Sequence, residues 1–210
     1  MRGIVYVLTN EYMLPDVIKI GRTTRERLKS RLKSLSSHSG VPVPFTCEYA
    51  AEVEDAKKVE DTLKLAFKEE RISRKREFFR TAPHKIITLL KGYATSDESV
   101  MVQDELDAIT TPEEQQAIAE GHARRSNFRF SIAAVPVGAE LVYVDDHRKK
   151  CKVLNDKKVE YKRKPYTLSG LATQFRIDAG YPTKGVQGAM YFLYEGELLN
   201  DRRNRLEAGE

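Results

Sequence analysis

The chain has 210 residues, of which 40% are hydrophobic and 32% are charged, and its formal net charge is +5. This composition predicts a globular protein with one large domain or two small ones. No apolar run approaches the roughly 20 residues that a bilayer-spanning helix needs, and no signal-peptide pattern opens the chain. We therefore expect a cytoplasmic protein without a membrane partner. Cys47 and Cys151 lack metal-binding spacing and are expected to be ordinary thiols.

The charge is distributed unevenly along the chain. Residues 1–95 carry a net charge of +7, residues 96–126 carry −6 and residues 127–210 carry +4. We therefore expect a basic domain over 1–95, an acidic helical linker over 96–126 and a second basic domain over 127–210. Basic domains favour polyanionic partners, of which nucleic acid is the commonest. A solvated surface with a small cationic excess explains the same numbers equally well.

The first domain has the pattern of an α+β fold. Runs rich in β-branched and aromatic residues predict three strands, at 3–9, 17–21 and 45–53. Apolar positions at helical spacing predict three helices, which begin near residues 25, 55 and 83. The short segment 77–80 is expected to be a strand or a turn. The predicted architecture is a small antiparallel three-stranded sheet flanked by helices.

Polar side chains on these elements have the chemistry that phosphodiester hydrolysis needs. Tyr6 on the first strand would take a proton from water, and Lys19 on the paired strand would lower the pKa of Tyr6. Arg31 on the basic helix would hold the phosphate through its planar guanidinium. Glu60 on the next helix would bind one Mg²⁺ or Mn²⁺. His38 follows the basic helix and would assist as an acid or base or contact DNA.

Each of these residues also has a simpler explanation, which stays open at this point. Tyr6 fits ordinary strand packing, and Lys19 fits a strand position that faces solvent. Arg31 is one of several cations on its helix, where a solvated face is the default. Glu60 has lysines nearby on its own helix, with which it can pair. His38 lies in a serine-rich stretch that is expected to be exposed.

The order of these residues resembles the GIY-YIG nuclease superfamily, and in particular a phage and bacterial branch with a K-I-G second motif. The resemblance covers residues 2–92, with matching segments at 3–6, 19–23, 30–35, 41–45, 60–63 and 76–79. It implies an endonuclease in which Tyr6 acts on the water, Arg31 steadies the phosphate and Glu60 holds a single divalent metal. It also implies that Gly21 is the motif glycine, where the backbone turns tightly.

Two departures from this pattern support an alternative. Lys19 stands where the superfamily name has a tyrosine, and Lys64 stands where the branch often has a histidine. No asparagine clearly fills a late position that some members use. A catalytically inactive DNA-binding protein on the same fold is therefore the alternative to an endonuclease. A protein-interaction adaptor that ignores nucleic acid is a third hypothesis.

The second domain has a different pattern, which predicts a small α+β domain. Short strands are predicted at 141–144, 152–154, 158–161 and 190–194, with a helix at 167–179. Residues 127–206 weakly resemble the RAMA domain, a module found beside restriction and methylation enzymes; the matching segments are 128–130, 135–141, 168–172 and 191–198. The resemblance implies binding of double-stranded DNA, including modified DNA. Together the two domains suggest a restriction or phage-defence endonuclease that is either a monomer or a homo-oligomer.

Both domains contain cations that are expected to contact DNA phosphates. In the first domain they are Arg22, Arg25, Arg27, Lys33, Arg74, Lys75 and Arg76, and in the second they are Arg148, Lys149, Lys162, Arg163 and Lys164. Such contacts supply affinity without reading the base sequence.

Overall fold

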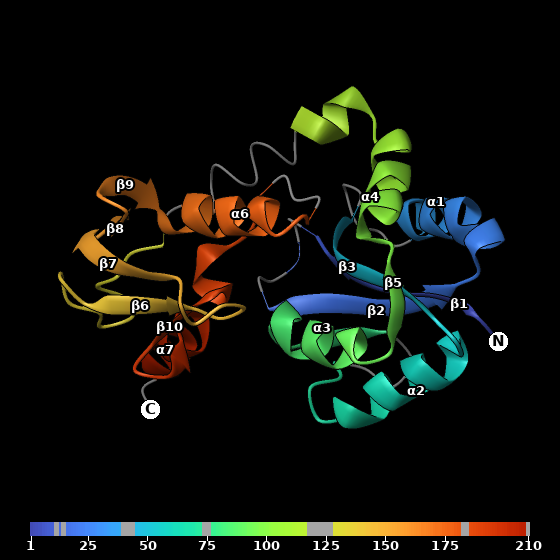
Figure 1. The fold of residues 1–210 in the computed structure, drawn as a ribbon, viewed down its shortest axis with the longest axis horizontal. Coiled ribbons are helices and arrows are strands. Elements are labelled where there is room, and N and C mark those ends of the chain that lie inside the picture. The colour runs from blue at the N-terminus through green and yellow to red at the C-terminus, as the bar shows by residue number, and fades with distance from the viewer. Residues whose placement is uncertain are drawn as a thin grey trace. The chain divides into compact units, whose positions relative to one another are not determined.

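A computed structural model of the chain describes residues 1–10, 13, 16–38, 45–72, 77–116, 128–181 and 185–208, without the side chains of 37 and 38. The chain divides into two compact units, one of residues 1–121 with 181–183 and one of residues 122–180 with 184–210. Each unit contains one antiparallel sheet (Figure 1), which confirms the predicted α+β class. No helix in the described ranges is long and apolar enough to cross a membrane.

Within the described residues, the sheet of the first unit has five strands in the order β4-β2-β1-β3-β5. The strands are β1 (Gly3–Thr9), β2 (Val17–Thr23), β3 (Thr46–Val53), β4 (Phe78–Arg80) and β5 (Ala94–Asp97). The three predicted strands form its centre, and β4 and β5 add one strand at each edge. The segment 77–80, expected to be a strand or a turn, contains β4, whereas β5 was not predicted, because a strand of four residues is too short to show an alternating pattern.

Among the described residues, four helices cover the two faces of this sheet. They are α1 (Leu28–His38), which follows a 3-10 turn at Arg25–Arg27, and α2 (Ala56–Ala66), α3 (Pro83–Lys91) and α4 (Ser99–Ala108). Successive side chains of a strand point to opposite faces. Val5 and Val7 of β1 therefore pack with α2 and α3, whereas Tyr6 packs with α1 and α4 on the other face. Figure 1 shows α1 and α4 on one side of the sheet and α2 and α3 on the other.

The segment expected to be an acidic linker, residues 96–126, begins inside the first unit. Its first residues complete β5, and α4 buries Val102 and Leu106, one helical turn apart, against the face that contains Tyr6. The Ser99 hydroxyl accepts a hydrogen bond from the backbone N–H of Ala50 at 3.0 Å. The first domain therefore extends past residue 95 and includes α4. Net charge suggested a linker because it does not reveal a narrow apolar stripe on a helix.

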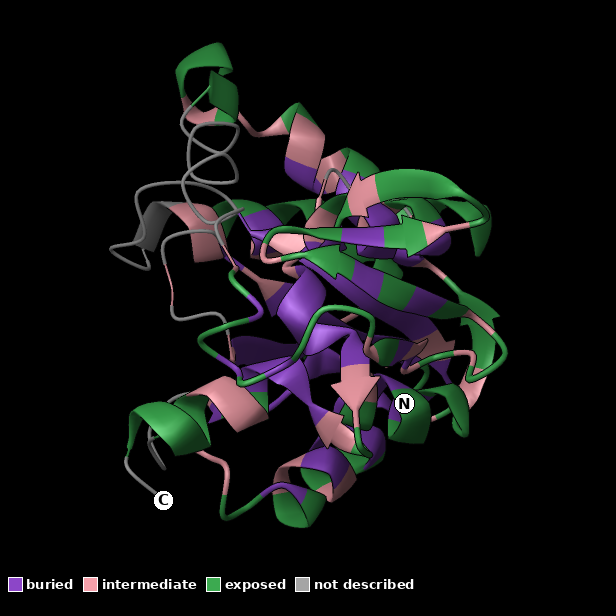
Figure 2. Cartoon of the chain, turned by 90° about the vertical axis from the view of Figure 1, so that its left-hand side faces the viewer, coloured by how far each residue is buried: buried purple, intermediate pink, exposed green. Residues whose placement is uncertain are grey.

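The second unit has six described strands in the order β11-β10-β6-β7-β8-β9. They are β6 (Glu140–Tyr143), β7 (Lys150–Asn155), β8 (Lys158–Tyr161), β9 (Lys164–Thr167), β10 (Phe192–Tyr194) and β11 (Glu197–Leu198). The helices are α6 (Leu168–Asp178) and α7 (Leu199–Glu207), and a 3-10 turn spans Gly188–Met190. Phe175 of α6 packs edge-on against Tyr143 of β6 and Tyr161 of β8. In both units the buried positions, purple in Figure 2, follow the strands and the inner helix faces.

Candidate active site

A fully buried tyrosine, Tyr6, lies on the antiparallel pair formed by β1 and β2. Tyr6 of β1 lies opposite Gly21 of β2 in the antiparallel register. A Cβ atom added to Gly21 would lie 2.5–2.6 Å from ring and hydroxyl atoms of Tyr6, which is closer than real Cβ contacts. The φ of Gly21 is not positive, so this glycine does not serve a tight turn as expected. It is needed because the Tyr6 ring occupies the space of a side chain.

The hydroxyl of Tyr6 contacts Arg31 rather than Lys19. The Arg31 Nε–H of α1 donates to the Tyr6 hydroxyl at 3.3 Å. Lys19 instead donates to Glu77 at 3.1 Å and lies over the Phe78 ring. Burial raises the pKa of Tyr6 to about 12, although the Arg31 charge opposes the rise. The phenol is therefore protonated at neutral pH, in contrast to the expectation that Lys19 lowers its pKa.

Glu77 was given no role in the sequence analysis, yet it connects three cations. Its carboxylate lies 3.1 Å from Lys19 and 3.5 Å from both Arg31 and Lys64. Burial opposes ionisation of Glu77, but these three positive charges outweigh burial and lower its pKa. In the sequence, only its place in the R-E-F-F segment pointed to a role for Glu77. Its three partners lie 13 to 58 positions away, so no local pattern connects them with it.

The predicted metal ligand, Glu60, is buried on α2 with an exposed fraction of 4%. Its Oε2 accepts from Arg22 Nε at 3.1 Å and lies 3.0 Å from Lys64 Nζ. No group of three His, Cys, Asp or Glu side chains suited to a metal occurs in the described part of the chain. Mg²⁺ is commonly held by only one or two carboxylates, with water and substrate phosphates as the other ligands. Glu60 fits such a site, because both ion pairs fall on one of its two oxygens.

Ion pairs join Glu60 to the Tyr6 side of the sheet, although α2 packs on the opposite face. Lys64 contacts both Glu60 and Glu77, and Glu77 contacts Arg31. This connection passes the start of β4, where Lys19 pairs with Phe78 and the Ile20 N–H donates to the Glu77 carbonyl. The negative charge of Glu60 interacts with the Tyr6 hydroxyl and contributes to the raised pKa of Tyr6. Tyr6, Lys19, Arg31 and Glu60 therefore belong to one polar network.

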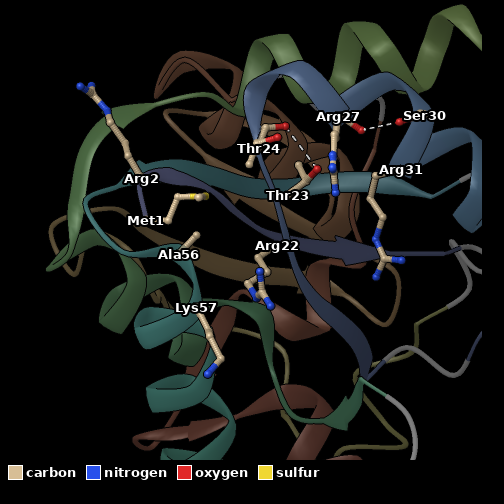
Figure 3. A pocket seen from close by; sticks show the side chains of 10 residues that line it. All are labelled: Met1, Arg2, Arg22, Thr23, Thr24, Arg27, Ser30, Arg31, Ala56 and Lys57. Carbon is tan, nitrogen blue, oxygen red and sulfur yellow. Dashed lines mark hydrogen bonds between the residues drawn. The ribbon is translucent and has the colours of Figure 1, made fainter.

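A cationic pocket of about 310 Å³ adjoins this network (Figure 3). Its lining residues come from the start of the chain, β2, the 3-10 turn, α1 and α2: Met1, Arg2, Arg22, Thr23, Thr24, Arg27, Ser30, Arg31, Ala56 and Lys57. Five of these side chains are cationic, and none of the described lining residues is acidic or aromatic. Arg22 and Arg27 were predicted to contact DNA and Arg31 to hold the phosphate that is cut, whereas Arg2 and Lys57 were given no role.

The remaining predicted residues of the first unit lie elsewhere or outside the described residues. Arg25 pairs with Glu98 at 2.6 Å, next to α4, and does not line the pocket. Lys33 is exposed on α1. His38 ends α1, but its side chain lies outside the described residues, as do Arg74, Lys75 and Arg76 and the segment 41–44.

The predicted cations of the second unit gather at one end of its sheet. Strands β6 to β9 form an antiparallel meander, so the β6–β7 and β8–β9 loops lie at the same end. Arg148 in the first loop is paired with Asp146, and Lys149 lies 4.7 Å from the Phe175 ring centroid. Lys162 and Arg163 form a two-residue hairpin loop in which both φ angles are positive, and Lys164 begins β9. Lys164 therefore starts a strand that the sequence analysis did not predict.

The buried phenol gives the protein a pH dependence that can be measured. The pKa of Tyr6 rises from an ordinary value of 10.0 to about 12, so folding stability is retained below pH 10 and lost as pH rises toward 12. This difference between the two pKa values corresponds to about 3 kcal/mol of folding free energy. We expect Tyr6→Phe to lose part of this alkaline destabilisation in urea unfolding curves measured between pH 9 and 12.

Two tyrosines provide the comparison for this experiment. Burial also raises the pKa of Tyr49 to about 12, so Tyr49→Phe removes a similar share of the pH dependence. Tyr93 is exposed, and Tyr93→Phe serves as the control. An unchanged alkaline slope in Tyr6→Phe, equal to that of the Tyr93 control, would contradict the burial of the Tyr6 hydroxyl.

The first unit is an α+β domain in which a polar network connects the two faces of its sheet. Residues 3–94 match the family model of the T5orf172 domain, which is related to the GIY-YIG nucleases. The matched range includes Tyr6, Arg31, Glu60 and Glu77, so the candidate site lies within this domain. The match covers less than half of the chain and does not reach the second unit. No curated protein and no solved structure matches the chain.

Proposed function

We propose that the protein is a divalent-metal-dependent DNA endonuclease that hydrolyses phosphodiester bonds. The observation that carries this proposal is the position of Arg31. Its guanidinium contacts the buried Tyr6, pairs with Glu77 and lines the cationic pocket. Through Glu77 and Lys64 it is connected to the buried carboxylate of Glu60. A phosphate in the pocket would thus meet the Arg31 guanidinium directly, with the buried phenol of Tyr6 against that guanidinium and the Glu60 carboxylate connected to it by ion pairs.

Arg31 has the main role toward the scissile phosphate in this proposal. Its guanidinium would donate to the phosphoryl oxygens and offset the negative charge that develops there. Tyr6 and Glu77 hold the guanidinium in place, so little reorganisation is needed during the reaction. Lys19 and Lys64 keep Glu77 ionised by placing positive charge beside it. A divalent ion on Glu60 would lower the pKa of a bound water and offset phosphoryl charge.

Tyr6 is a neutral hydrogen-bonding group in this scheme. Because the pKa of Tyr6 is about 12, its hydroxyl does not act as a proton acceptor at neutral pH in the protein alone. Its oxygen accepts from Arg31, which leaves its own O–H to donate. That donor would orient the attacking water or a phosphoryl oxygen.

We assign the second unit the role of holding DNA, and we place the whole protein among restriction or phage-defence enzymes. The cationic loops at one end of its sheet support this role. Arg148, Lys149, Lys162 and Arg163 lie on two hairpin loops, beside the aromatic side chains of Tyr161 and Phe175. Loops of this kind suit phosphate contacts with double-stranded DNA, including modified DNA.

The alternative function is DNA binding without cleavage, and one observation favours it. The carboxylate of Glu60 is held by two cations, Arg22 and Lys64. Both would compete with a metal ion for the same group. A protein in which these ion pairs persist on DNA would bind the duplex and leave it intact.

Incubation with supercoiled plasmid separates the two functions. We expect nicking or linearisation with Mg²⁺ or Mn²⁺ and none with EDTA, on a panel of plain, methylated and hydroxymethylated DNA. Binding to every substrate without cleavage of any would favour the inactive alternative. Failure to bind DNA even at low salt would contradict both functions.

A further inference from the structure

Three of the five cationic side chains of the pocket form ion pairs with carboxylates of the protein. The pairs are Arg2 with Glu52, Arg22 with Glu60 and Arg31 with Glu77. Arg27 and Lys57 differ, because neither forms an ion pair with any residue that the structure describes. Both side chains are exposed at the pocket, so their charge is available to a ligand.

These two cations come from opposite sides of the sheet. Arg27 ends the 3-10 turn that leads into α1, and Lys57 lies in the first turn of α2. They line the same pocket, with Arg22 of β2 between the two elements (Figure 3). Positive side chains in one pocket without carboxylate partners repel each other, which destabilises the folded state. A bound anion relieves this repulsion.

The lining residues indicate which kind of anion fits. The pocket offers guanidinium, ammonium and hydroxyl groups, but no described lining residue has an aromatic ring on which a base could stack. It therefore suits a backbone phosphate rather than a base. Arg31 lines the pocket too, so a phosphate at Arg27 and Lys57 would be a neighbour of the phosphate at Arg31 on the same strand.

We propose that Arg27 and Lys57 form a second phosphate site, which anchors the nucleic-acid backbone beside the phosphate to be cut. This inference rests on the proposed function, because it takes the ligand to be the nuclease substrate. The site supplies affinity and register without a choice of sequence. Arg27 and Lys57 are binding residues, and they take no part in the chemical step.

The chain offers a matched control for each residue. Lys29 on α1 and Lys58 on α2 are exposed lysines close to Arg27 and Lys57, and neither lines the pocket. Fluorescence anisotropy measures the affinity of each variant for a labelled DNA duplex over a series of salt concentrations. The four variants are Arg27→Ala, Lys57→Ala, Lys29→Ala and Lys58→Ala. The melting temperature of each variant checks its folding.

We expect Arg27→Ala and Lys57→Ala to weaken binding severalfold on duplexes of unrelated sequence. Their plots of log affinity against log salt are expected to have a slope smaller by about 1, as for the loss of one phosphate contact. The two control variants are expected to retain the wild-type slope. In cleavage assays the pocket variants raise KM and leave kcat nearly unchanged.

Three outcomes would overturn this inference. In the first outcome, Lys57→Ala and Lys58→Ala bind DNA with equal affinity and show the same slope of log affinity against log salt. Another is a loss of kcat with unchanged binding, which would assign Arg27 or Lys57 to the reaction itself. The third is a loss of binding to polyglutamate without a loss for DNA, which would indicate an acidic protein partner. The binding assay needs no cleavage, so it tests the phosphate site even where the nuclease proposal fails.

Discussion

Glu60→Ala is expected to remove DNA cleavage and to leave DNA binding largely intact. Glu60 is the buried carboxylate of the network, and it would be the chain's ligand for the divalent ion. Its loss removes that electrostatic stabilisation at the phosphate, so we expect the cleavage rate to fall by about 100-fold or more. The pocket cations that would bind the backbone remain. Plasmid cleavage with Mg²⁺ measures the loss, and fluorescence anisotropy measures the binding.

Two further variants separate a local effect from unfolding. Glu60→Gln keeps the size of the side chain and removes its charge, so it is expected to lose cleavage as well. Asp61→Ala removes an exposed carboxylate from the next position of α2 and is expected to cleave normally. Calorimetric titration with Mn²⁺ in the absence of DNA gives a readout besides activity. Full cleavage by Glu60→Ala would reject this residue as the metal ligand.

Loss of Glu60 leaves its partners with other neighbours. Lys64 keeps its contact with Glu77, and the Arg22 side chain is 44% exposed to solvent. Neither cation is therefore left buried without a partner. We expect the Glu60 variants to remain folded, with a melting temperature lower by a few degrees at most.

Gly21→Ala is expected to destabilise the first unit strongly. The added Cβ would lie 2.5–2.6 Å from the Tyr6 side chain, and Tyr6 is fully buried on the face of the sheet that α1 and α4 cover. Gly21 pairs directly with Tyr6 in the sheet, so neither strand can move aside without loss of hydrogen bonds. Overpacking of this kind costs about 1–3 kcal/mol. The displaced ring would also lose its contact with Arg31, so cleavage is expected to fall as well.

Gly92→Ala provides the matched control. Gly92 caps α3 in a right-handed helical conformation, and an added Cβ would approach only the Leu89 carbonyl oxygen, at 3.3 Å. We expect its free energy of unfolding to stay within about 0.5 kcal/mol of wild type. Urea unfolding of the two variants makes the comparison. Wild-type stability in Gly21→Ala would show that the Tyr6 ring does not occupy the space above this glycine.

The sequence by itself determined the local elements of the first unit. The strand patterns at 3–9, 17–21 and 45–53 became β1, β2 and β3 with small changes at their ends, and the predicted helices became α1, α2 and α3. These predictions succeeded because hydrophobic periodicity is a local property that a short segment reveals. The order of Tyr6, Arg31 and Glu60 also pointed to the domain that the family comparison supports.

Only the tertiary structure decided how the site residues are connected. Lys19 was paired with Tyr6 because their strands are adjacent, but Glu77, 58 positions away, takes the Lys19 ammonium instead. The pKa of Tyr6 depends on how completely the ring is buried, and that in turn depends on α1, α4 and Gly21. The pocket joins residues from the start of the chain to α2. Burial and ion pairing act through space, so residue order and local pattern do not reveal them.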